Sequence, residues 1–404
     1  MKKKTLIISY TFPPSNGIGG RRWAKFAKYL SKNERDIYLL TKDIGLAASN
    51  KVYSGIKEVD FFKSGYPQIL NNNPTKLRDK IYYKLALLYV KLFSIGNYYD
   101  RAIFLEKEFL KKAERIVKFN QINEVIITGA PFRLLYFGTL LKKKCKIILL
   151  CDIRDPWTWG KGYGMTLLSS ERKEKELYFE SEVLRHADLI TVPVVPMLDH
   201  LKSHYPAFSN KIKLLTHAYD STDFEVKSND DKESGFDLVY GGTIYRDLKN
   251  EFESIYQLCK ENEELDFNLQ IHTNRFQYLT KEKLKEIRGK LSILPYVSTN
   301  ELMNKIKNAD AYLLIFPDEV KDFITTKFYE IIQCRTPIIY IGVEGDVSKF
   351  ITSNNLGVHI KPEDIKRQLL EIISSKFVGD HNTKFPIEQY SFKSVTETLL
   401  EYLK

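Results

Sequence analysis

The sequence has few residues of the kinds that hold metal ions or disulfide frameworks. Its 404 residues include four cysteines, which are scattered and show no metal-binding spacing. We expect them to be buried free thiols in a reducing cytoplasm. The seven histidines show no ligand spacing either, and no Asp-x-Asp motif occurs, so the sequence predicts no metal site.

Long apolar runs and several nucleotide-related signatures are also missing. No stretch of about 18 apolar residues occurs, so we expect no transmembrane helix. The basic start, MKKKTLIISYTF, has a short apolar stretch that ends at Thr11 without a cleavage site, and we expect no secretory signal. The dinucleotide pattern G-x-G-x-x-G is absent. No RNP, zinc-finger or helix-turn-helix signature supports a nucleic-acid-binding protein.

Composition and charge indicate a folded protein of two unlike halves. The chain is 43% hydrophobic and 28% charged, and its length favours two domains. Residues 1–220 hold 38 basic and 21 acidic side chains, whereas residues 221–404 hold 24 and 30. The basic half suggests an anionic partner, either nucleic acid or a membrane surface, unless it is simply a solvated lysine-rich surface.

Short apolar strands alternate with helical patterns in two series. The first series is expected at residues 5–10, 37–41, 125–128, 146–151, 189–192 and 213–215. The second is expected at residues 238–240, 267–271, 292–294, 311–316 and 337–341. Trp23, Phe26, Ala27 and Leu30 recur at helical spacing between the first two strands, which predicts a doubly wound parallel sheet.

The polar segment 220–234 separates the two series and reads as a linker. We therefore expect a first Rossmann-like domain at residues 1–220, a linker at 221–235 and a second Rossmann-like domain at 236–385. A final helix within residues 386–404 could cross back to the first domain. Ligands of such sheets bind beyond the carboxyl ends of the strands, which predicts a site in the loops there.

The segment from Asp322 to Tyr340, DFITTKFYEIIQCRTPIIY, carries the most specific pattern. A loop with Thr325 and Thr326 leads into a short helix with Lys327 and Glu330. A helix start suits an anionic group, and carboxylates accept hydrogen bonds from ribose or sugar hydroxyls. The combination predicts a nucleotide-sugar site; the alternative is that Glu330 is an ordinary exposed helix residue.

Thr326-Lys327-Phe328-Tyr329-Glu330, followed by Pro337, resembles the donor-site signature of retaining glycosyltransferases of the GT-B fold, family 4. The resemblance implies two Rossmann-like domains facing each other across a cleft. It also implies that Asp322 and Glu330 bind the donor sugar and ribose. Asp322 stands where the family usually has Glu, and Arg335 stands where it usually has Gly.

Loops of the first half carry further resemblance to this family. Gly19 and Gly20 follow Pro13-Pro14, and the second glycine is implied to contact the donor diphosphate, with Arg21 near a phosphate or the acceptor. The stretch Asp152-Ile153-Arg154-Asp155-Pro156-Trp157 resembles a cleft loop. There Asp152 or Asp155 would orient the acceptor hydroxyl and Arg154 would bind a phosphate. The alternatives are a turn shaped by glycine and an internal Arg–Asp bridge.

Loops of the second half complete the predicted donor site. Gly242, Thr243, Arg246 and Lys249 follow its first strand, and the resemblance implies that the Arg–Lys pair clamps the diphosphate. Further along the chain, Tyr296 would stack on the base and the Val297 backbone would hydrogen-bond it, while His272 would face the cleft. Ordinary structural roles stay open for these side chains.

Residues 76–117 are basic and unusually apolar. Residues 85–93 are almost all apolar or aromatic, with lysines and arginines around them. Such a segment could form core helices or the edge that meets an anionic membrane, where each basic side chain contributes on the order of 1 kcal/mol.

Together these patterns predict a retaining, metal-independent hexosyltransferase with no cofactor and a nucleotide-diphosphate sugar as substrate. Its acceptor would be a saccharide or lipid-linked saccharide for cell-surface polysaccharide, at the cytoplasmic face of an anionic membrane. We expect no nucleic-acid partner. A nucleotide-sugar epimerase of the same architecture and a nucleic-acid-binding protein are the alternatives.

Overall fold

A computed structural model describes residues 2–14, 18–43, 55–71, 73–223, 235–242, 244–245, 247–287, 289–379, 381 and 384–404. It contains two compact units. Unit 1 comprises Met1–Thr216 and Phe392–Lys404, and unit 2 comprises His217–Ser391. Most of the predicted linker, residues 224–234, lies outside the described residues.

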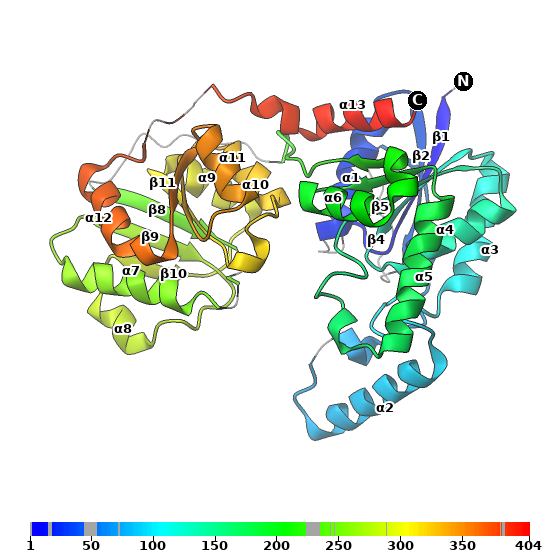
Figure 1. The fold of residues 1–404 in the computed structure, drawn as a ribbon, viewed down its shortest axis with the longest axis horizontal. Helices are drawn as coiled ribbons and strands as arrows, with labels where there is room; N and C mark the ends of the chain where they lie inside the picture. Colours follow the sequence, from blue (N-terminus) through cyan, green and yellow to red (C-terminus); the bar gives the residue numbers. More distant parts are fainter. Residues whose placement is uncertain are drawn as a thin grey trace. The chain divides into compact units, whose positions relative to one another are not determined.

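Unit 1 is built on seven parallel strands in the order β3-β2-β1-β4-β5-β6-β7 (Figure 1). The strands are β1 (Lys3–Ser9), β2 (Arg35–Lys42), β3 (Ile56–Phe62), β4 (Glu124–Gly129), β5 (Ile148–Ile153), β6 (Leu189–Val192) and β7 (Ile212–Leu214). Central strands are continuous apolar runs; Leu6, Ile7 and Ile8 of β1 are fully buried because helices cover both faces.

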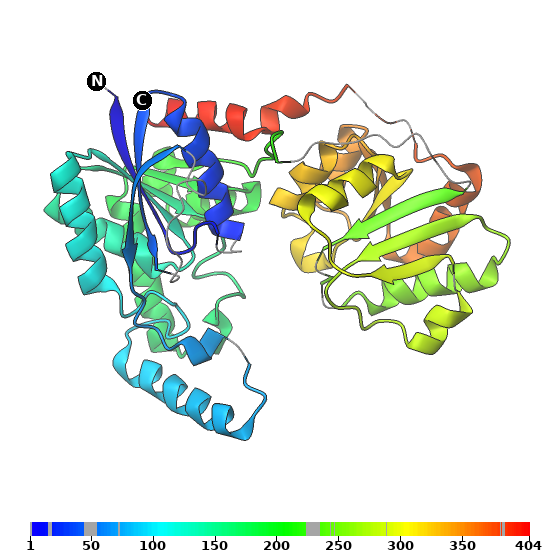
Figure 2. The ribbon, with the colours of Figure 1, turned by 180° about the vertical axis from the view of Figure 1, so that it is seen from behind.

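Helices α1 (Ile18–Ser31) and α4 (Arg133–Lys144) cover opposite faces of this sheet, as right-handed crossovers require (Figure 2). The predicted apolar stripe of α1, from Trp23 to Leu30, is buried. The other helices are α2 (Leu77–Phe93), α3 (Glu106–Asn120), α5 (Ser170–His186), α6 (Val195–His204) and α13 (Phe392–Tyr402). The C-terminal α13 packs on α1, where the Phe26 and Phe392 rings lie 5.2 Å apart.

Unit 2 has six parallel strands in the order β10-β9-β8-β11-β12-β13. These are β8 (Phe236–Gly241), β9 (Phe267–His272), β10 (Leu291–Leu294), β11 (Ala311–Ile315), β12 (Ile338–Ile341) and β13 (Gly357–Ile360). The helices are α7 (Lys249–Glu261), α8 (Lys281–Glu286), α9 (Thr299–Asn308), α10 (Thr326–Ile332), α11 (Asp346–Ser353) and α12 (Ile365–Ser375).

Two apolar layers fill unit 2, one on each face of its sheet. Phe252 of α7 and Leu369 of α12 belong to one layer. Met303 of α9, Phe328 of α10 and Val347 of α11 belong to the other. Helices therefore cover both faces of the sheet, which completes a doubly wound α/β unit.

Both sheets reverse their direction of growth once, between β1 and β4 in unit 1 and between β8 and β11 in unit 2. These are the switch points at which open α/β sheets bind ligands. The predicted pair of doubly wound parallel sheets is confirmed. The loops after β1, β4, β8 and β11 are the places to look for function.

The basic, apolar segment 76–117 forms two helices of different character. Phe109 and Ala113 of α3 are fully buried, so the core-helix interpretation is correct there. In α2, by contrast, Val90 is the one buried residue of the helix. Among the residues described, no helix combines the length and apolar character that a membrane crossing requires.

Candidate functional site

The end of β8 and the start of α10 meet at Gly242 and Lys327 in unit 2. Gly242 has a φ of +112°, and a Cβ atom added to it would lie 2.6 Å from the Lys327 Nζ. Its N–H donates to the His272 carbonyl at 2.8 Å, which ties the end of β8 to the end of β9. Only glycine combines this backbone conformation with room for the ammonium group.

The Lys327 ammonium lies over two aromatic rings. Its Nζ is 5.1 Å from the Tyr240 ring centroid and 5.7 Å from that of Tyr312. The Tyr312 hydroxyl donates to the Gly241 carbonyl at 3.2 Å, which fixes one of those rings. No carboxylate in the described part of the chain forms an ion pair with Lys327. A half-buried cation held by π-faces at a switch point suits an anionic ligand such as a phosphate.

His272, at the carboxyl end of β9, has one ring nitrogen that no described residue hydrogen-bonds. The side chain is 3% exposed, and its Nδ1 lies 3.2 Å from the Pro295 carbonyl. A carbonyl only accepts, so Nδ1 carries the proton and Nε2 carries a lone pair. Nε2 is buried and has no hydrogen-bond partner among the described residues. Burial lowers the pKa of His272 and favours this neutral form.

Buried polar atoms are usually hydrogen-bonded, and an orphan calls for an explanation. The His272 Nε2 can accept a hydrogen bond from a hydroxyl group. His272 ends β9, and its backbone carbonyl accepts from Gly242 at the end of β8, so this acceptor belongs to the strand next to the one that the Lys327 ammonium contacts.

Thr326, the first residue of α10, pairs with a histidine outside the predicted site. Its Oγ1 lies 3.0 Å from the Nδ1 of His217. Glu330 is one helical turn further along and shares this face of α10. Thr325 precedes the helix in an extended conformation. Thr325, Thr326, Lys327 and Glu330 are all half-buried.

Asp322 has a structural contact that its spacing from Glu330 does not predict. Its Oδ1 accepts the Asp346 N–H at 2.9 Å and so caps the start of α11. Gly345 makes room for it, since an added Cβ would lie 2.6 Å from the same oxygen. The loop after β11 is thereby fastened to the loop after β12.

The remaining predicted residues of unit 2 lie in three loops. Tyr296, after β10, is 55% exposed, and Val297 beside it is half-buried. Lys249 is the exposed first residue of α7. Thr243 and Arg246 lie outside the described residues.

In unit 1, Gly19 and Gly20 are buried at the start of α1. A Cβ at Gly19 would lie 1.0 Å from the Arg154 Nη1, and one at Gly20 would lie 2.2 Å from the Thr11 carbonyl oxygen. The Arg154 guanidinium therefore lies directly on the backbone of this helix start. The sequence had left Arg154 between a phosphate ligand and an internal bridge. Arg21 beside them is half-buried.

Asp155 forms an internal ion pair with Arg154, which is one of the two roles that the sequence left open for this arginine. Its Oδ2 accepts from the Arg154 Nε at 3.2 Å and from the Tyr163 hydroxyl at 2.8 Å. Burial and this carboxylate together raise the pKa of Tyr163 to about 12. The side chain of Asp155 is 35% exposed, so it keeps access to solvent.

Asp152 is surrounded by donors within the core of unit 1. It is fully buried and accepts from the Trp23 Nε1 at 2.7 Å, and from the Thr128 and Thr191 hydroxyls at 2.9 Å each. The Arg22 Nη2 lies 3.7 Å from it. These contacts join α1 to β4, β5 and β6 through one carboxylate.

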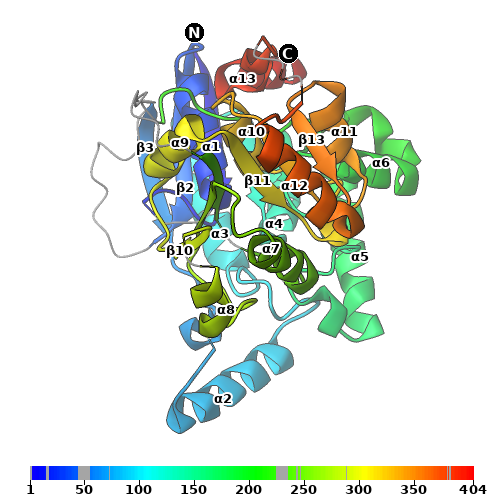
Figure 3. The same ribbon diagram turned by 90° about the vertical axis from the view of Figure 1, so that its left-hand side faces the viewer.

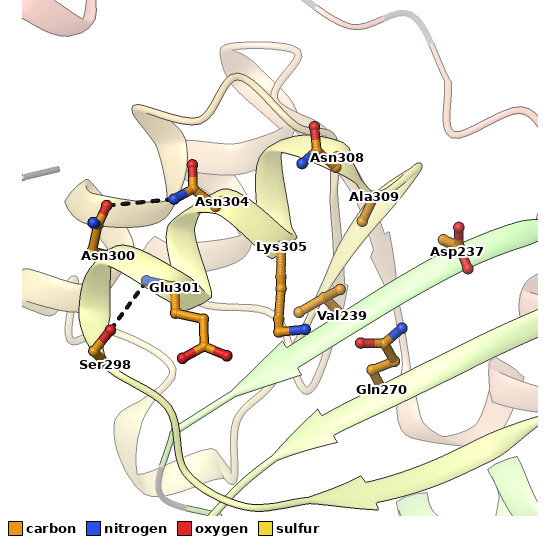
Figure 4. A pocket seen from close by; sticks show the side chains of 10 residues that line it. All are labelled: Asp237, Val239, Gln270, Ser298, Asn300, Glu301, Asn304, Lys305, Asn308 and Ala309. Carbon is orange, nitrogen blue, oxygen red and sulfur yellow. Dashed lines mark hydrogen bonds between the residues drawn. The ribbon is translucent and has the colours of Figure 1, made fainter. Parts of the chain in front are cut away.

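A separate cavity of about 470 Å³ lies beside α9 in unit 2 (Figure 4). Asp237 of β8 and Gln270 of β9 line it together with Glu301 and Lys305 of α9. None of its lining residues is among the predicted donor-binding residues. The strand ends at Gly242 and His272 are the stronger candidate, because they combine a cation, an orphaned acceptor and a switch point.

Among the described residues, no group of three or more His, Cys, Asp or Glu side chains could hold a metal ion.

Comparison with known proteins identifies the fold. No family model matches the chain, and no curated protein matches its sequence. The structure is similar to a glycosyltransferase from Rickettsia africae ESF-5, with a TM-score of 0.64, 13% identity and coverage of 100% of this chain and 99% of that one. The fold is GT-B.

Two further solved structures of similar fold carry names that state different activities. The lipopolysaccharide outer core galactosyltransferase WaaB in its apo form has a TM-score of 0.59, 12% identity and 99% coverage of both chains. A protein from Listeria monocytogenes described as a UDP-N-acetylglucosamine 2-epimerase has a TM-score of 0.57 and 11% identity, and covers 100% of this chain and 96% of its own. At these identities the likeness shows the GT-B fold alone.

Sequence reasoning missed two contacts in these loops. The Thr326–His217 pair joins residues 109 positions apart, and an isolated histidine in THAYD gave no sign of it. The contact of Arg154 with Gly19 also spans distant loops. The sequence gave one indication of this contact. Both residues follow strands, and the ends of parallel strands meet at the same edge of a sheet.

Proposed function

We propose that the protein is a retaining glycosyltransferase that binds its nucleotide-diphosphate sugar at the carboxyl edge of the unit 2 sheet. The observation that carries the proposal is that the Lys327 ammonium lies against the end of β8, while the buried His272 Nε2, which has no partner among the described residues, belongs to the end of the neighbouring strand β9. A diphosphate supplies the negative charge, and a sugar or ribose supplies the hydroxyl group.

In the proposed reaction, negative charge develops on the leaving diphosphate. The bond between the anomeric carbon and the diphosphate oxygen breaks, and the acceptor oxygen bonds to that carbon. The acceptor proton passes to the leaving phosphate, so no separate base and no metal are needed. Lys327 stabilises the leaving diphosphate, with Lys249 and Arg246 as further cations. Glu330 and Asp322 bind hydroxyl groups of the donor, and Thr325 and Thr326 begin the helix that carries Lys327.

Further roles complete this proposal. Tyr296 stacks on the base, and the Val297 backbone hydrogen-bonds it. In unit 1, Gly19, Gly20 and Arg21 contact the acceptor, and Asp155 orients the acceptor hydroxyl. The acceptor is a saccharide or lipid-linked saccharide of cell-surface polysaccharide synthesis. The excess of basic residues in the first half supports a reaction beside an anionic membrane.

Nucleotide-sugar epimerisation is the second candidate, because the Listeria protein described as an epimerase shares the whole fold. The same donor site would serve, but the sugar would be altered without transfer. A nucleic-acid-binding role has no comparable support.

The test is to follow donor turnover by NMR with a panel of nucleotide-diphosphate sugars, with and without a mixture of saccharide acceptors. The proposal predicts acceptor-dependent release of the nucleoside diphosphate, and a product with the donor's anomeric configuration. Conversion of the sugar without acceptor would instead establish the epimerase. An inverted product would contradict the retaining mechanism.

A further inference from the structure

Helix α2 exposes an unusual amount of apolar surface at the rim of unit 1. Leu77 is 77% exposed, and Leu92 and Phe93 are each 68% exposed. Ile81, Tyr82, Leu85, Leu88 and Tyr89 of the same helix are also exposed, as is Ile95 just beyond it. In all three ribbon views α2 stands apart from the sheet of unit 1 (Figures 1, 2 and 3). Contiguous exposed apolar surface of this kind marks an interaction site.

The orientation of α2 is set by its opposite face. Val90 is buried with Tyr66 and Tyr98, and Leu87 packs against the same cluster. At 100° per residue, Leu85 and Leu92 fall on the side of the helix opposite Val90. The exposed leucines therefore point away from the body of unit 1.

A basic edge runs beside the apolar face. Lys80, Lys84 and Lys91 are exposed and fall between the buried face and the apolar face. No ion pair in the described part of the chain involves these three lysines. Asp79 is the single acidic residue of the helix, so its charge is strongly positive.

Helix α2 is also held firmly at its C-terminal end. The Arg172 guanidinium, from α5, donates to the carbonyls of Lys91, Ser94 and Gly96. One arginine thus satisfies the Lys91 carbonyl in the last turn of α2 and two carbonyls of the loop that follows the helix. The apolar face is presented on a fixed platform and not on a loose arm.

We propose that α2 is a membrane-docking helix that lies in the plane of an anionic lipid bilayer. Its apolar face enters the boundary between headgroups and acyl chains, and Lys80, Lys84 and Lys91 contact the lipid headgroups. Such helices combine a polar face rich in lysine with an apolar face of Leu, Phe or Trp. The inference does not depend on whether the protein transfers a sugar.

Charge decides between a bilayer and a second copy of the chain. If two copies joined through α2, the three lysines of one helix would lie close to the same three lysines of the other. Each helix has one aspartate, Asp79, to offset this positive charge. Like charges across an interface oppose association. An anionic bilayer supplies the complementary charge over the whole length of the helix.

The first experiment is flotation of the full chain with vesicles of phosphatidylcholine alone or with phosphatidylglycerol added. Four proteins are compared: the wild type, the double variant Leu85→Glu/Leu92→Glu, the triple variant Lys80→Gln/Lys84→Gln/Lys91→Gln, and Phe119→Glu. Phe119 is a matched control, since it is 83% exposed and lies at the end of α3 in the same unit. All the changed side chains are exposed, and circular dichroism and melting temperature verify the fold of each variant.

The wild type and Phe119→Glu are expected to float with the anionic vesicles and stay behind with the neutral ones. The leucine variant is expected to lose flotation. Each lysine near an anionic surface should strengthen partitioning onto the vesicles by about fivefold. The triple variant is therefore expected to partition about 100-fold more weakly than the wild type. Equal flotation of the α2 variants and the wild type would overturn the proposal, as would failure of the wild type to float.

Two further readouts sharpen the test. The four native cysteines are all buried, so an environment-sensitive dye can be attached selectively to Leu92→Cys. Its emission should shift to the blue with anionic vesicles, whereas the same dye at Phe119→Cys should not respond. If light scattering shows a dimer that Leu85→Glu/Leu92→Glu converts to a monomer, α2 is an interface between copies and the membrane proposal is wrong.

Discussion

Two buried polar side chains at strand ends, one in each unit, differ in how completely they are hydrogen-bonded. Asp152 closes β5 in unit 1, and each of its carboxylate oxygens is engaged by donors of neighbouring elements. His272 closes β9 in unit 2, and its Nε2 has no partner among the described residues. A buried group with every bond made holds a fold together, whereas a buried group with one bond missing suits a ligand. The position of a polar residue at a strand end does not by itself distinguish a structural role from a ligand-binding role.

The comparison predicts its largest effect at Asp152. Asp152→Ala leaves the Arg22 guanidinium, the Trp23 N–H and two threonine hydroxyls without their shared acceptor. Breaking a buried ion pair in this way costs about 3–5 kcal/mol of unfolding free energy. Urea denaturation measures it.

The half-exposed Asp155 is the matched control for that experiment. Asp155→Ala removes a pair in contact with solvent and should cost about 1 kcal/mol or less. If the two variants lose similar stability, Asp152 does not have the architectural role described.

Lys327→Ala is expected to act on binding and leave the fold intact. A hydrogen bond to a charged group contributes about 1.5–3 kcal/mol, so affinity for a nucleoside diphosphate should fall by roughly tenfold to a hundredfold. The melting temperature without ligand should stay near that of the wild type. A variant that unfolds, or that binds as tightly as the wild type, would break the contrast between the units.

Gly242→Ala should affect both properties. The φ of +112° strains any side chain, at a cost of about 1–3 kcal/mol, and the added methyl group displaces the Lys327 ammonium. We expect a lower melting temperature and weaker nucleotide binding in the same protein. Gly289→Ala is a useful control because its φ is also positive, but no described residue other than its chain neighbours lies within 4 Å of the added Cβ.

The smallest effect concerns His272 and pH. Because burial lowers its pKa in the folded state, the unfolded chain takes up this proton first as the pH falls below about 6.5. The wild type should therefore lose stability relative to His272→Gln between pH 7.5 and 5.5. The difference between their melting temperatures at the two pH values measures this. No change in that difference would mean that His272 titrates normally.

Much of the fold could be predicted from the sequence because its central strands are uninterrupted apolar runs. Strands β1, β4, β8 and β11 were all expected close to their observed positions. The edge strands β3 and β13 were not expected. The sequence of β3, IKEVDFF, includes three charged residues among its seven, and the four residues of β13 begin with glycine, so neither resembles a buried strand.

The candidate site was less predictable for a different reason. Loops after strands could be recognised one at a time, which brought Gly19, Gly242 and Lys327 to attention. The partners of these residues come from loops far away in the sequence, as with Arg154 on Gly19. Asp152 shows the converse, since the sequence predicted a role with the acceptor but gave no sign of the donors from α1, β4 and β6 that surround this carboxylate.

The most direct test of the central claim is calorimetric titration of UDP, GDP, dTDP, CMP and ADP into three proteins. These are the wild type, Lys327→Ala, and Lys281→Ala as a control for loss of an exposed lysine of unit 2. The account predicts that one nucleoside diphosphate binds the wild type and Lys281→Ala alike, and binds Lys327→Ala much more weakly. Equal binding to all three proteins, or no binding to any, would contradict a donor site at this edge of unit 2.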